Sequence, residues 1–264
     1  MILVLLLILL YILANRCRKG HPGLNALQGW NYAHRGLHKP GVPENSMAAF
    51  RAALDHGYGI EFDVHLLADG NLAIIHDSSL KRTAGADVHI EDLTTEELKN
   101  YPLQGTEECI PTFPELLDLY AGKAPLIVEL KPERGNHAAL CETAARMLEH
   151  YEGVYCIESF DPRCVRWFKE NRPQVIRGQL AENFLKSDSK MPLWLRFALT
   201  HQLMNFGTVP DFTAYKFADR KQLSSQICRK LWKAQGVTWT LKTREEYDIA
   251  VTEGWIPIFE GFEP

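Results

Sequence analysis

The feature that most constrains the fold of this chain is a regular alternation of short apolar segments with amphipathic ones, from about residue 30 to residue 264. Strands that alternate with helices are typical of a parallel sheet in which each helix connects two neighbouring strands. Over this length the pattern predicts an α/β fold, a (β/α)8 barrel of the TIM type. We expect strands at 30–33, 59–66, 72–75, 125–130, 154–159, 175–180, 212–215, 237–241 and 256–259, and helices at 46–56, 114–120, 137–151, 162–171, 193–205, 221–235 and 244–253.

The predicted strands number one more than an eight-stranded barrel needs. Asp69-Gly70 separates the second strand from the third and is typical of a tight hairpin turn, which would make that pair antiparallel. Alternatively, the last segment, 256–259, caps the barrel. The sequence leaves both interpretations open. Residues 78–111 form an excursion, with a helix start at 93–98, before the next long helix.

Composition places the body of the chain among ordinary globular domains, with 46% hydrophobic and 23% charged residues. No shift in composition divides it in two, so we assign 1–20 to an N-terminal segment, 21–29 to a linker and 30–264 to one barrel domain. The six cysteines are scattered without a C-x-x-C motif, which predicts free thiols rather than a disulfide framework.

The charge distribution excludes one class of partner. The formal net charge is −4, yet the first twenty residues carry three basic side chains and no acidic one, so the body stands at −7. A surface this acidic is unsuited to the phosphate backbone of nucleic acids, and we expect no nucleic-acid partner.

The N-terminus departs from this ordinary composition. Residues 1–14 are an unbroken apolar run, followed by Arg16, Arg18 and Lys19. A full membrane span needs about 20 apolar residues, but bilayer thinning and snorkelling of flanking basic side chains rescue shorter ones. We therefore expect a membrane anchor, an apolar anchor helix, with the catalytic domain in the cytoplasm by the positive-inside rule. The alternatives are a cleaved secretory signal, which would carry its basic residues before the run, and an unusual apolar lead-in.

Charged residues interrupt two of the apolar strands. Glu61 and Asp63 lie two apart in one strand, and Glu129 and Lys131 lie two apart in another. Residues two apart in a strand share a face, so each pair points to the same side. A carboxylate buried alone is costly and normally needs a cation beside it. Together with His34-Arg35 and His76-Asp77, these acids predict a metal site for hydrolysis.

An ordered series of motifs at 33–50, 57–70 and 76–83 resembles the glycerophosphodiester phosphodiesterase family. The resemblance continues at 128–131, 159–160 and 239–240, so it covers essentially everything after residue 30. It implies a (β/α)8 barrel with a small insertion before the second helix, which the excursion at 78–111 matches. It also implies a divalent cation and cleavage of a phosphodiester to glycerol 3-phosphate and an alcohol.

The resemblance carries over residue by residue. It implies that two histidines act as acid and base, that three carboxylates bind the metal, and that two cationic side chains lie beside the phosphate. These residues are His34 and His76; Glu61, Asp63 and Glu129; and Arg35 and Lys131, respectively. It further implies that a glycerol hydroxyl of the substrate attacks phosphorus and gives a cyclic phosphate that water opens. Which histidine is the base stays open.

Elementary chemistry agrees with these roles. Imidazole has an intrinsic pKa suited to both giving and taking a proton near neutral pH. Three carboxylates without a thiolate favour a hard cation, Mg²⁺ or Ca²⁺, which polarises a phosphoryl oxygen. Arg35 is suited to bidentate binding of phosphate, whereas Lys131 acts as a point charge.

Neighbouring residues suggest supporting roles. We expect Asp77 to orient a histidine or a loop, Glu44 to brace the loop of Arg35, and Asn45 or Ser46 to cap a helix. Trp239 follows a barrel strand, where it either belongs to the core or forms a wall of the glycerol pocket and binds substrate.

Two segments depart from the family pattern. The chain ends at 256–264 without the usual D-G-I-I-T-D-x-P-like sequence, and residues 191–215 are more apolar than a solvated helix needs. We expect neither segment to touch the catalytic residues, but both affect which alcohol can be the leaving group of the substrate. The first functional hypothesis is a glycerophosphodiester phosphodiesterase, with a lysophospholipase D-type enzyme acting on a lysophospholipid as the alternative. A third hypothesis is a catalytically inactive, membrane-tethered binding module, which the complete set of site residues disfavours.

Overall fold

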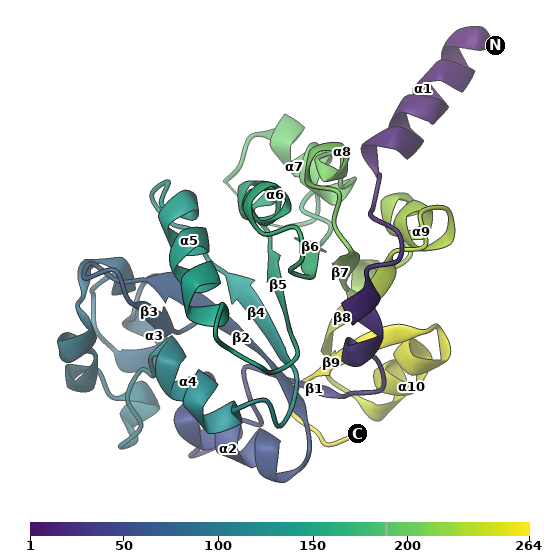
Figure 1. Cartoon of the computed structure of the whole chain (residues 1–264). Coiled ribbons are helices and arrows are strands. Elements are labelled where there is room, and N and C mark those ends of the chain that lie inside the picture. Colours follow the sequence, from purple (N-terminus) through teal and green to yellow (C-terminus); the bar gives the residue numbers. More distant parts are fainter. Residues whose placement is uncertain (188–189) are drawn as a thin grey trace.

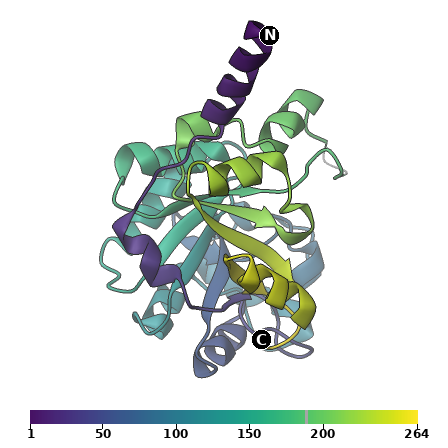
Figure 2. The same ribbon diagram turned by 90° about the vertical axis from the view of Figure 1, so that its right-hand side faces the viewer.

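The computed structural model of the chain describes residues 1–187 and 190–264, and its centre is a closed parallel barrel (Figures 1 and 2). The sheet runs in the order β1-β9-β8-β7-β6-β5-β4-β2-β3, and an additional pairing of β1 with β2 closes it. The strands are β1 (Tyr32–His34), β2 (Gly59–Leu66), β3 (Leu72–Ile74), β4 (Leu126–Leu130), β5 (Tyr155–Ser159), β6 (Arg177–Ala181), β7 (Phe212–Lys216), β8 (Gln235–Leu241) and β9 (Trp255–Phe259). The predicted TIM-type barrel is confirmed.

The surplus strand is β3, which pairs antiparallel with β2 and lies outside the closed ring. The turn between them contains Gly70, whose φ of +81° is a conformation that favours glycine. The last strand, β9, lies between β8 and β1 and pairs in parallel with both, so it closes the barrel rather than capping it. The hairpin signal at 69–70 was therefore the correct one of the two interpretations.

Helices surround the barrel and cover its outer face (Figure 1). Most lie within the predicted ranges, but the predicted helix at 193–205 is two helices. Gln202 interrupts it with a positive φ of 48°. The helices around the barrel are α2 (Met47–Asp55), α4 (Phe113–Tyr120), α5 (His137–Leu148), α6 (Pro162–Asn171), α7 (Leu193–Thr200), α8 (Asn205–Thr208), α9 (Leu223–Lys230) and α10 (Arg244–Thr252).

The excursion at 78–111 is a compact insertion before α4, the second helix on the barrel. It contains α3 (Lys81–Ala84) and the 3₁₀ helices η2 (Ile90–Asp92), η3 (Thr95–Asn100) and η4 (Leu103–Gly105). Its buried leucines and isoleucines form a small core of their own against β3. The insertion implied by the resemblance is present.

Apolar side chains fill the barrel interior below the carboxyl ends of the strands. Tyr32, Ile127, Phe212 and Ile258 are all buried there, and Leu27 of the 3₁₀ helix η1 (Pro22–Leu27) joins them from the segment predicted as a linker. Charged side chains inside the barrel are therefore found toward the carboxyl ends of the strands, the end at which barrel enzymes carry their active sites. The six cysteines are free, as expected.

The apolar N-terminal run forms helix α1 (Ile2–Ala14), which projects from the body (Figures 1 and 2). Its base is held by a hydrogen bond of 2.8 Å between Tyr11 Oη and His201 Nδ1, and Trp232 Nε1 donates to the carbonyl of Ile12 at 3.0 Å. A helix of 13 residues rises only about 20 Å, against a hydrocarbon thickness of about 30 Å. Across residues 1–187 and 190–264 no helix is both long and apolar enough to cross a membrane, so the predicted transmembrane anchor is not found.

Candidate active site

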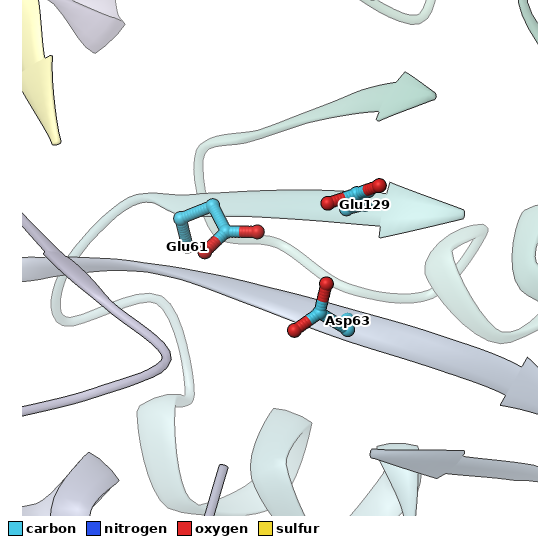
Figure 3. A group of neighbouring side chains, drawn as sticks. All are labelled: Glu61, Asp63 and Glu129. Atoms are coloured by element: carbon cyan, nitrogen blue, oxygen red, sulfur yellow. The ribbon is translucent and has the colours of Figure 1, made fainter. Parts of the chain in front are cut away.

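Three carboxylates meet at the carboxyl ends of β2 and β4. Asp63 of β2 lies opposite Glu129 of β4 in the strand register, and Glu61 lies two residues earlier on the same face. Figure 3 shows the three side chains directed toward a common point between the two strands. One oxygen from each lies within 4.8 Å of the others, and all three residues are buried. The two strands thus bring together the acids that the sequence predicted as one cluster.

Two cationic side chains face this cluster. The Lys131 ammonium lies 3.1 Å from Asp63 Oδ1 and 2.7 Å from Glu129 Oε1, and Arg35 Nε lies 3.5 Å from Asp63 Oδ2. Asn45 donates a further hydrogen bond of 2.9 Å to Asp63 Oδ2. Burial alone would raise the pKa of Asp63, but the positive charges of Lys131 and Arg35, the neighbouring His76 and the hydrogen bond from Asn45 hold it well below its usual range. Asp63 is therefore ionised at neutral pH.

For the remaining acids of the cluster, burial outweighs the nearby positive charge, although Lys131 also contacts Glu129. Burial first, and then repulsion among the carboxylates, raises the pKa of Glu61 well above its usual value, and burial raises that of Glu129 to about 7. Glu158 of β5 is also buried, has a raised pKa for the same reasons, and lines the same cavity. If Glu61, Asp63, Glu129 and Glu158 are all ionised, Arg35 and Lys131 balance two of their four negative charges, while the fifth carboxylate of the cavity, Glu182, is paired with Lys216.

His34 lies at the end of β1, and its ring is oriented by the end of the chain. Its Nδ1 lies 2.5 Å from Glu260 Oε2, and its Nε2 lies 3.7 Å from Glu61 Oε2. Burial lowers the pKa of His34 although the Glu260 contact opposes this, and hydrogen bonds from His34 and His38 lower the pKa of Glu260. The expectation that the closing segment would not touch the catalytic residues was wrong.

His76 follows β3 and is oriented by a second carboxylate. Its Nδ1 lies 2.6 Å from Asp77 Oδ1, and Arg82 Nε donates to the other oxygen of Asp77 at 2.5 Å. Arg82 also donates to Glu44 at 2.7 Å, and Glu44 in turn accepts from Arg35 at 2.8 Å. Asp77 and Glu44 thus occupy the supporting positions expected of them. Burial lowers the pKa of His76 as well, so both imidazoles favour the neutral form.

The backbone of the loop after β1 adopts two successive left-handed conformations and packs closely against α2. Arg35 adopts a positive φ of 55°, and Gly36 follows with a φ of +80°. A Cβ atom on Gly36 would lie 2.9 Å from the backbone of Ala49 in α2, so only glycine allows this approach. Ser46, one of the two expected caps, accepts a hydrogen bond from Ala49 N at the start of α2.

A cavity of about 220 Å³ opens between these groups and an apolar wall. The wall contains Phe160 and Trp239, whose rings meet edge to face with centroids 5.6 Å apart. Trp239 donates through Nε1 to the carbonyl of Ala214 at 3.2 Å, which fixes its ring as part of the wall. Of the two interpretations of Trp239, the structure places it in the pocket. The other lining residues are His34, Arg35, Glu61, His76, Glu129, Lys131, Glu158, Leu180, Glu182 and Ile258.

Three acidic residues of the site were not singled out from the sequence as members of it. Glu260 follows β9 directly, Glu158 lies in β5 two residues before Phe160, and Glu182 follows β6 and pairs with Lys216 at 2.8 Å. Each lies at the carboxyl end of a barrel strand. An inspection of every strand end for charged residues, rather than of the motif positions alone, would have found them.

A parallel barrel with buried carboxylates and two imidazoles at its carboxyl end has the features of an enzyme active site that could hold an oxygen-bound cation. Comparison with known proteins narrows this description. Residues 34–255 match the model of the glycerophosphoryl diester phosphodiesterase family, and the chain belongs to that family. The prediction of a phosphoric diester hydrolase is thereby confirmed.

Individual relatives agree with this assignment. A glycerophosphodiester phosphodiesterase from Caldanaerobacter subterraneus subsp. tengcongensis is 32% identical over 189 residues, which cover 68% of this chain and 77% of that protein. A lysophospholipase D from Rattus norvegicus is 30% identical over 122 residues, covering 41% and 38%. The solved structure of an Oleispira antarctica phosphodiesterase in complex with its product sn-glycerol-3-phosphate shares the fold, with a TM-score of 0.72 at 21% identity, covering 89% of this chain and 94% of the other.

Proposed function

We propose that this chain hydrolyses glycerophosphodiesters to glycerol 3-phosphate and an alcohol, with His34 and His76 as the acid–base pair. One observation carries the proposal: each imidazole is held through Nδ1 by its own carboxylate, and both line one cavity with the acidic cluster. A carboxylate on Nδ1 fixes the tautomer and leaves Nε2 available for proton transfer.

The same proposal includes a divalent cation, Mg²⁺ or Ca²⁺, held by Glu61, Asp63 and Glu129. The donor set consists of oxygens only, which suits a hard cation. Glu61 Oε2 is buried and accepts no hydrogen bond, and the missing positive charge of the site equals that of one divalent ion. When bound, such an ion neutralises charge on the phosphoryl oxygens and lowers the pKa of a hydroxyl beside it.

The side chains of the protein transfer the protons and bind the phosphate. One neutral imidazole takes the proton of the attacking hydroxyl, and the other, in its protonated form, gives a proton to the departing alcohol oxygen. Arg35 and Lys131 bind the phosphate oxygens, while Trp239 lines the same cavity with its ring. We propose that the attacking hydroxyl is the 2-hydroxyl of the substrate's glycerol, which expels the alcohol and forms a cyclic phosphate that one water molecule then opens to glycerol 3-phosphate. A substrate without the 2-hydroxyl group would then not turn over, and unchanged turnover would exclude internal attack.

The substrate assignment is tested with two assays side by side. We expect release of glycerol 3-phosphate from glycerophosphocholine, lost with EDTA and restored by Mg²⁺ or Ca²⁺. Release of choline from a lysolipid alone would select the lysophospholipase D-type alternative, which the named relative from Rattus norvegicus supports. No cation-dependent activity on either substrate would contradict the proposal.

We also propose that the chain is attached to the cytoplasmic face of a membrane by partial insertion of α1. The helix is apolar throughout, and Arg16, Arg18 and Lys19 follow it. Basic residues beside a membrane segment favour the cytoplasmic side. In protease protection on membrane vesicles, the barrel should be digested in cytoplasm-out vesicles. A barrel shielded inside such vesicles would contradict this orientation.

Cation binding should become stronger as pH rises. The pKa of Glu129 is raised to about 7 and that of Glu61 is raised well above its usual value, so protons occupy the cluster at mildly acidic pH. A cation must displace them before it binds. We expect the rise in Tm caused by excess Mg²⁺ or Ca²⁺ to be larger at about pH 7.5 than at about pH 5.5. An equal rise at both pH values, with sodium at matched ionic strength as control, would contradict the assigned ligands.

Replacing Glu260 by Gln should impair catalysis through the orientation of His34. The substitution removes the carboxylate that contacts Nδ1 and that raises the His34 pKa. We expect kcat to fall by at least about tenfold with little change in KM, and the His34-dependent limb of the pH profile to move to lower pH. The matched control is Glu263→Gln, whose side chain is half exposed and lies near His56 on the surface. A normal kcat and pH profile in Glu260→Gln would exclude this positioning role.

A further inference from the structure

Helices α7 and α8 expose large apolar side chains beyond what a solvated helix needs. Leu193 and Trp194 are each 70% exposed, Phe206 is 63% exposed and Phe197 is 48% exposed. Single exposed apolar residues are ordinary on soluble proteins, but a group of this size marks an interaction site. These four residues are called the α7–α8 patch below.

The α7–α8 patch is continuous with the base of α1. The ring of Phe197 lies 4.4 Å from that of His201, and His201 contacts Tyr11 of α1 through its ring and its Nδ1. Figures 1 and 2 both place α1, α7 and α8 on the same side of the molecule. The apolar residues of α1 are themselves exposed, from 82% for Ile2 to 44% for Leu13. Helix and patch thus form one apolar surface.

The shape of this surface favours lipid over protein as its occupant. A protein groove or a second copy would cover one stripe of a helix, whereas α1 is apolar on every side. A hydrocarbon environment covers the whole circumference of such a helix without a further protein core around it. The aromatic side chains of the patch match the boundary between hydrocarbon and head groups, where Trp is enriched.

The charges around the surface favour anionic lipid. Residues 1–30 carry three basic side chains and no acidic one, and residues 183–210 carry three basic and one acidic, which leaves the rest of the chain at −9. Arg16, Lys19 and Lys190 are exposed along these two segments, as is Lys186, whose ammonium also lies 3.4 Å from Asp219 Oδ1. Basic residues beside an apolar surface bind anionic head groups. The rest of the protein is acidic and would be repelled by the same anionic head groups.

We propose that the α7–α8 patch docks into the head-group region of an anionic phospholipid bilayer, as a second contact beside α1. The docking goes beyond the proposed catalytic function and does not depend on it. Docking of the patch also affects substrate access. Helix α7 follows β6 in the chain, and Glu182, in the connection between them, lines the catalytic cavity. Phe184, in the same connection, packs edge to face against Phe160 of the cavity wall with ring centroids 5.8 Å apart. Docking would therefore hold this side of the cavity mouth near the lipid surface.

The test uses the full chain and vesicles of phosphatidylcholine with or without phosphatidylglycerol. Hydrogen exchange should show protection of 193–200 and 205–208 only when phosphatidylglycerol vesicles are present. The triple variant Trp194→Ser, Phe197→Ser, Phe206→Ser should sediment with these vesicles at least about tenfold more weakly than the native chain, while α1 is retained. Its far-UV circular dichroism and Tm establish that it is folded.

The matched control replaces exposed apolar residues on α9 and α10, Leu223→Ser, Ile249→Ser and Val251→Ser, which are 59%, 43% and 47% exposed. This control should bind vesicles as the native chain does. Equal binding by the folded patch variant and the native chain would overturn the proposal. Protection of the patch without vesicles, accompanied by a dimer in sedimentation, would assign the surface to a second copy instead. Because binding is read without turnover, failure of the catalytic proposal would leave this test unaffected.

Discussion

Replacing Glu61 by Gln is expected to abolish turnover and at the same time to stabilise the cation-free protein. Glu61 contributes one of the three oxygens that lie within 4.8 Å of one another, so its loss removes a ligand from the proposed cation site. Its pKa is raised by burial and by repulsion from Asp63, Glu129 and Glu158, which means that its charge destabilises the folded state at neutral pH. The neutral amide removes that repulsion.

We expect the activity of Glu61→Gln to fall by about a thousandfold or more, and the rise in Tm caused by Mg²⁺ or Ca²⁺ to disappear. The Tm in EDTA near pH 7.5 should exceed that of the native chain. The sign follows from the raised pKa: a carboxyl that holds its proton longer when folded loses stability as pH rises through that pKa, and Gln loses none. Glu170→Gln, at an exposed position on α6 paired with Arg166, is the control and should change neither quantity appreciably. Retained activity, or a lower Tm in EDTA, would contradict the assigned role.

Replacing either His34 or His76 by Ala should lower kcat by about 10²- to 10⁴-fold, the usual contribution of a general acid or base. Because both residues act in one reaction, the double variant should lose much less than the product of the two single effects. The control is His56→Ala, which replaces a half-exposed histidine on the surface beside α2. Activity within about twofold of the native chain in either single variant would remove that histidine from the mechanism.

The same two variants decide which imidazole is the acid. A substrate whose leaving alcohol is a nitrophenol needs no protonation of the departing oxygen. The variant that lacks the acid should recover most of its activity on this substrate, whereas the variant that lacks the base should not. The structure alone leaves the roles equivalent, because Glu260 and Asp77 hold the two rings in the same way. Recovery in both variants or in neither would contradict the assignment of one imidazole as acid and the other as base.

The fold was largely predictable because strand and helix signals alternate with a constant order. The sequence left one ambiguity open, the surplus strand, and the structure settles it: the turn at Gly70 pairs β3 with β2, whereas β9 closes the ring by contacts with β1 and β8. Helix ends were less predictable. The break after α7 depends on Gln202, a residue whose side chain gives no turn signal but whose backbone adopts a positive φ.

The site was predictable where neighbouring residues in one strand share a face, as Glu61 and Asp63 do. It was not predictable where the partner lies far along the chain. Glu260 reaches His34 across 226 positions, and only closure of the barrel brings them together. The short length of α1 was evident from the sequence, because the apolar run of residues 1–14 is already shorter than a full span, and the helix ends at Ala14.

The most direct test of this account is a crystal structure of the chain grown with Mg²⁺ or Ca²⁺ and glycerol 3-phosphate. The account predicts one cation coordinated by Glu61, Asp63 and Glu129, with the phosphate between Arg35 and Lys131. Both imidazoles should lie within hydrogen-bonding distance of the bound molecule. Carboxylates that face different directions, or a cation bound away from all three, would contradict the central claim.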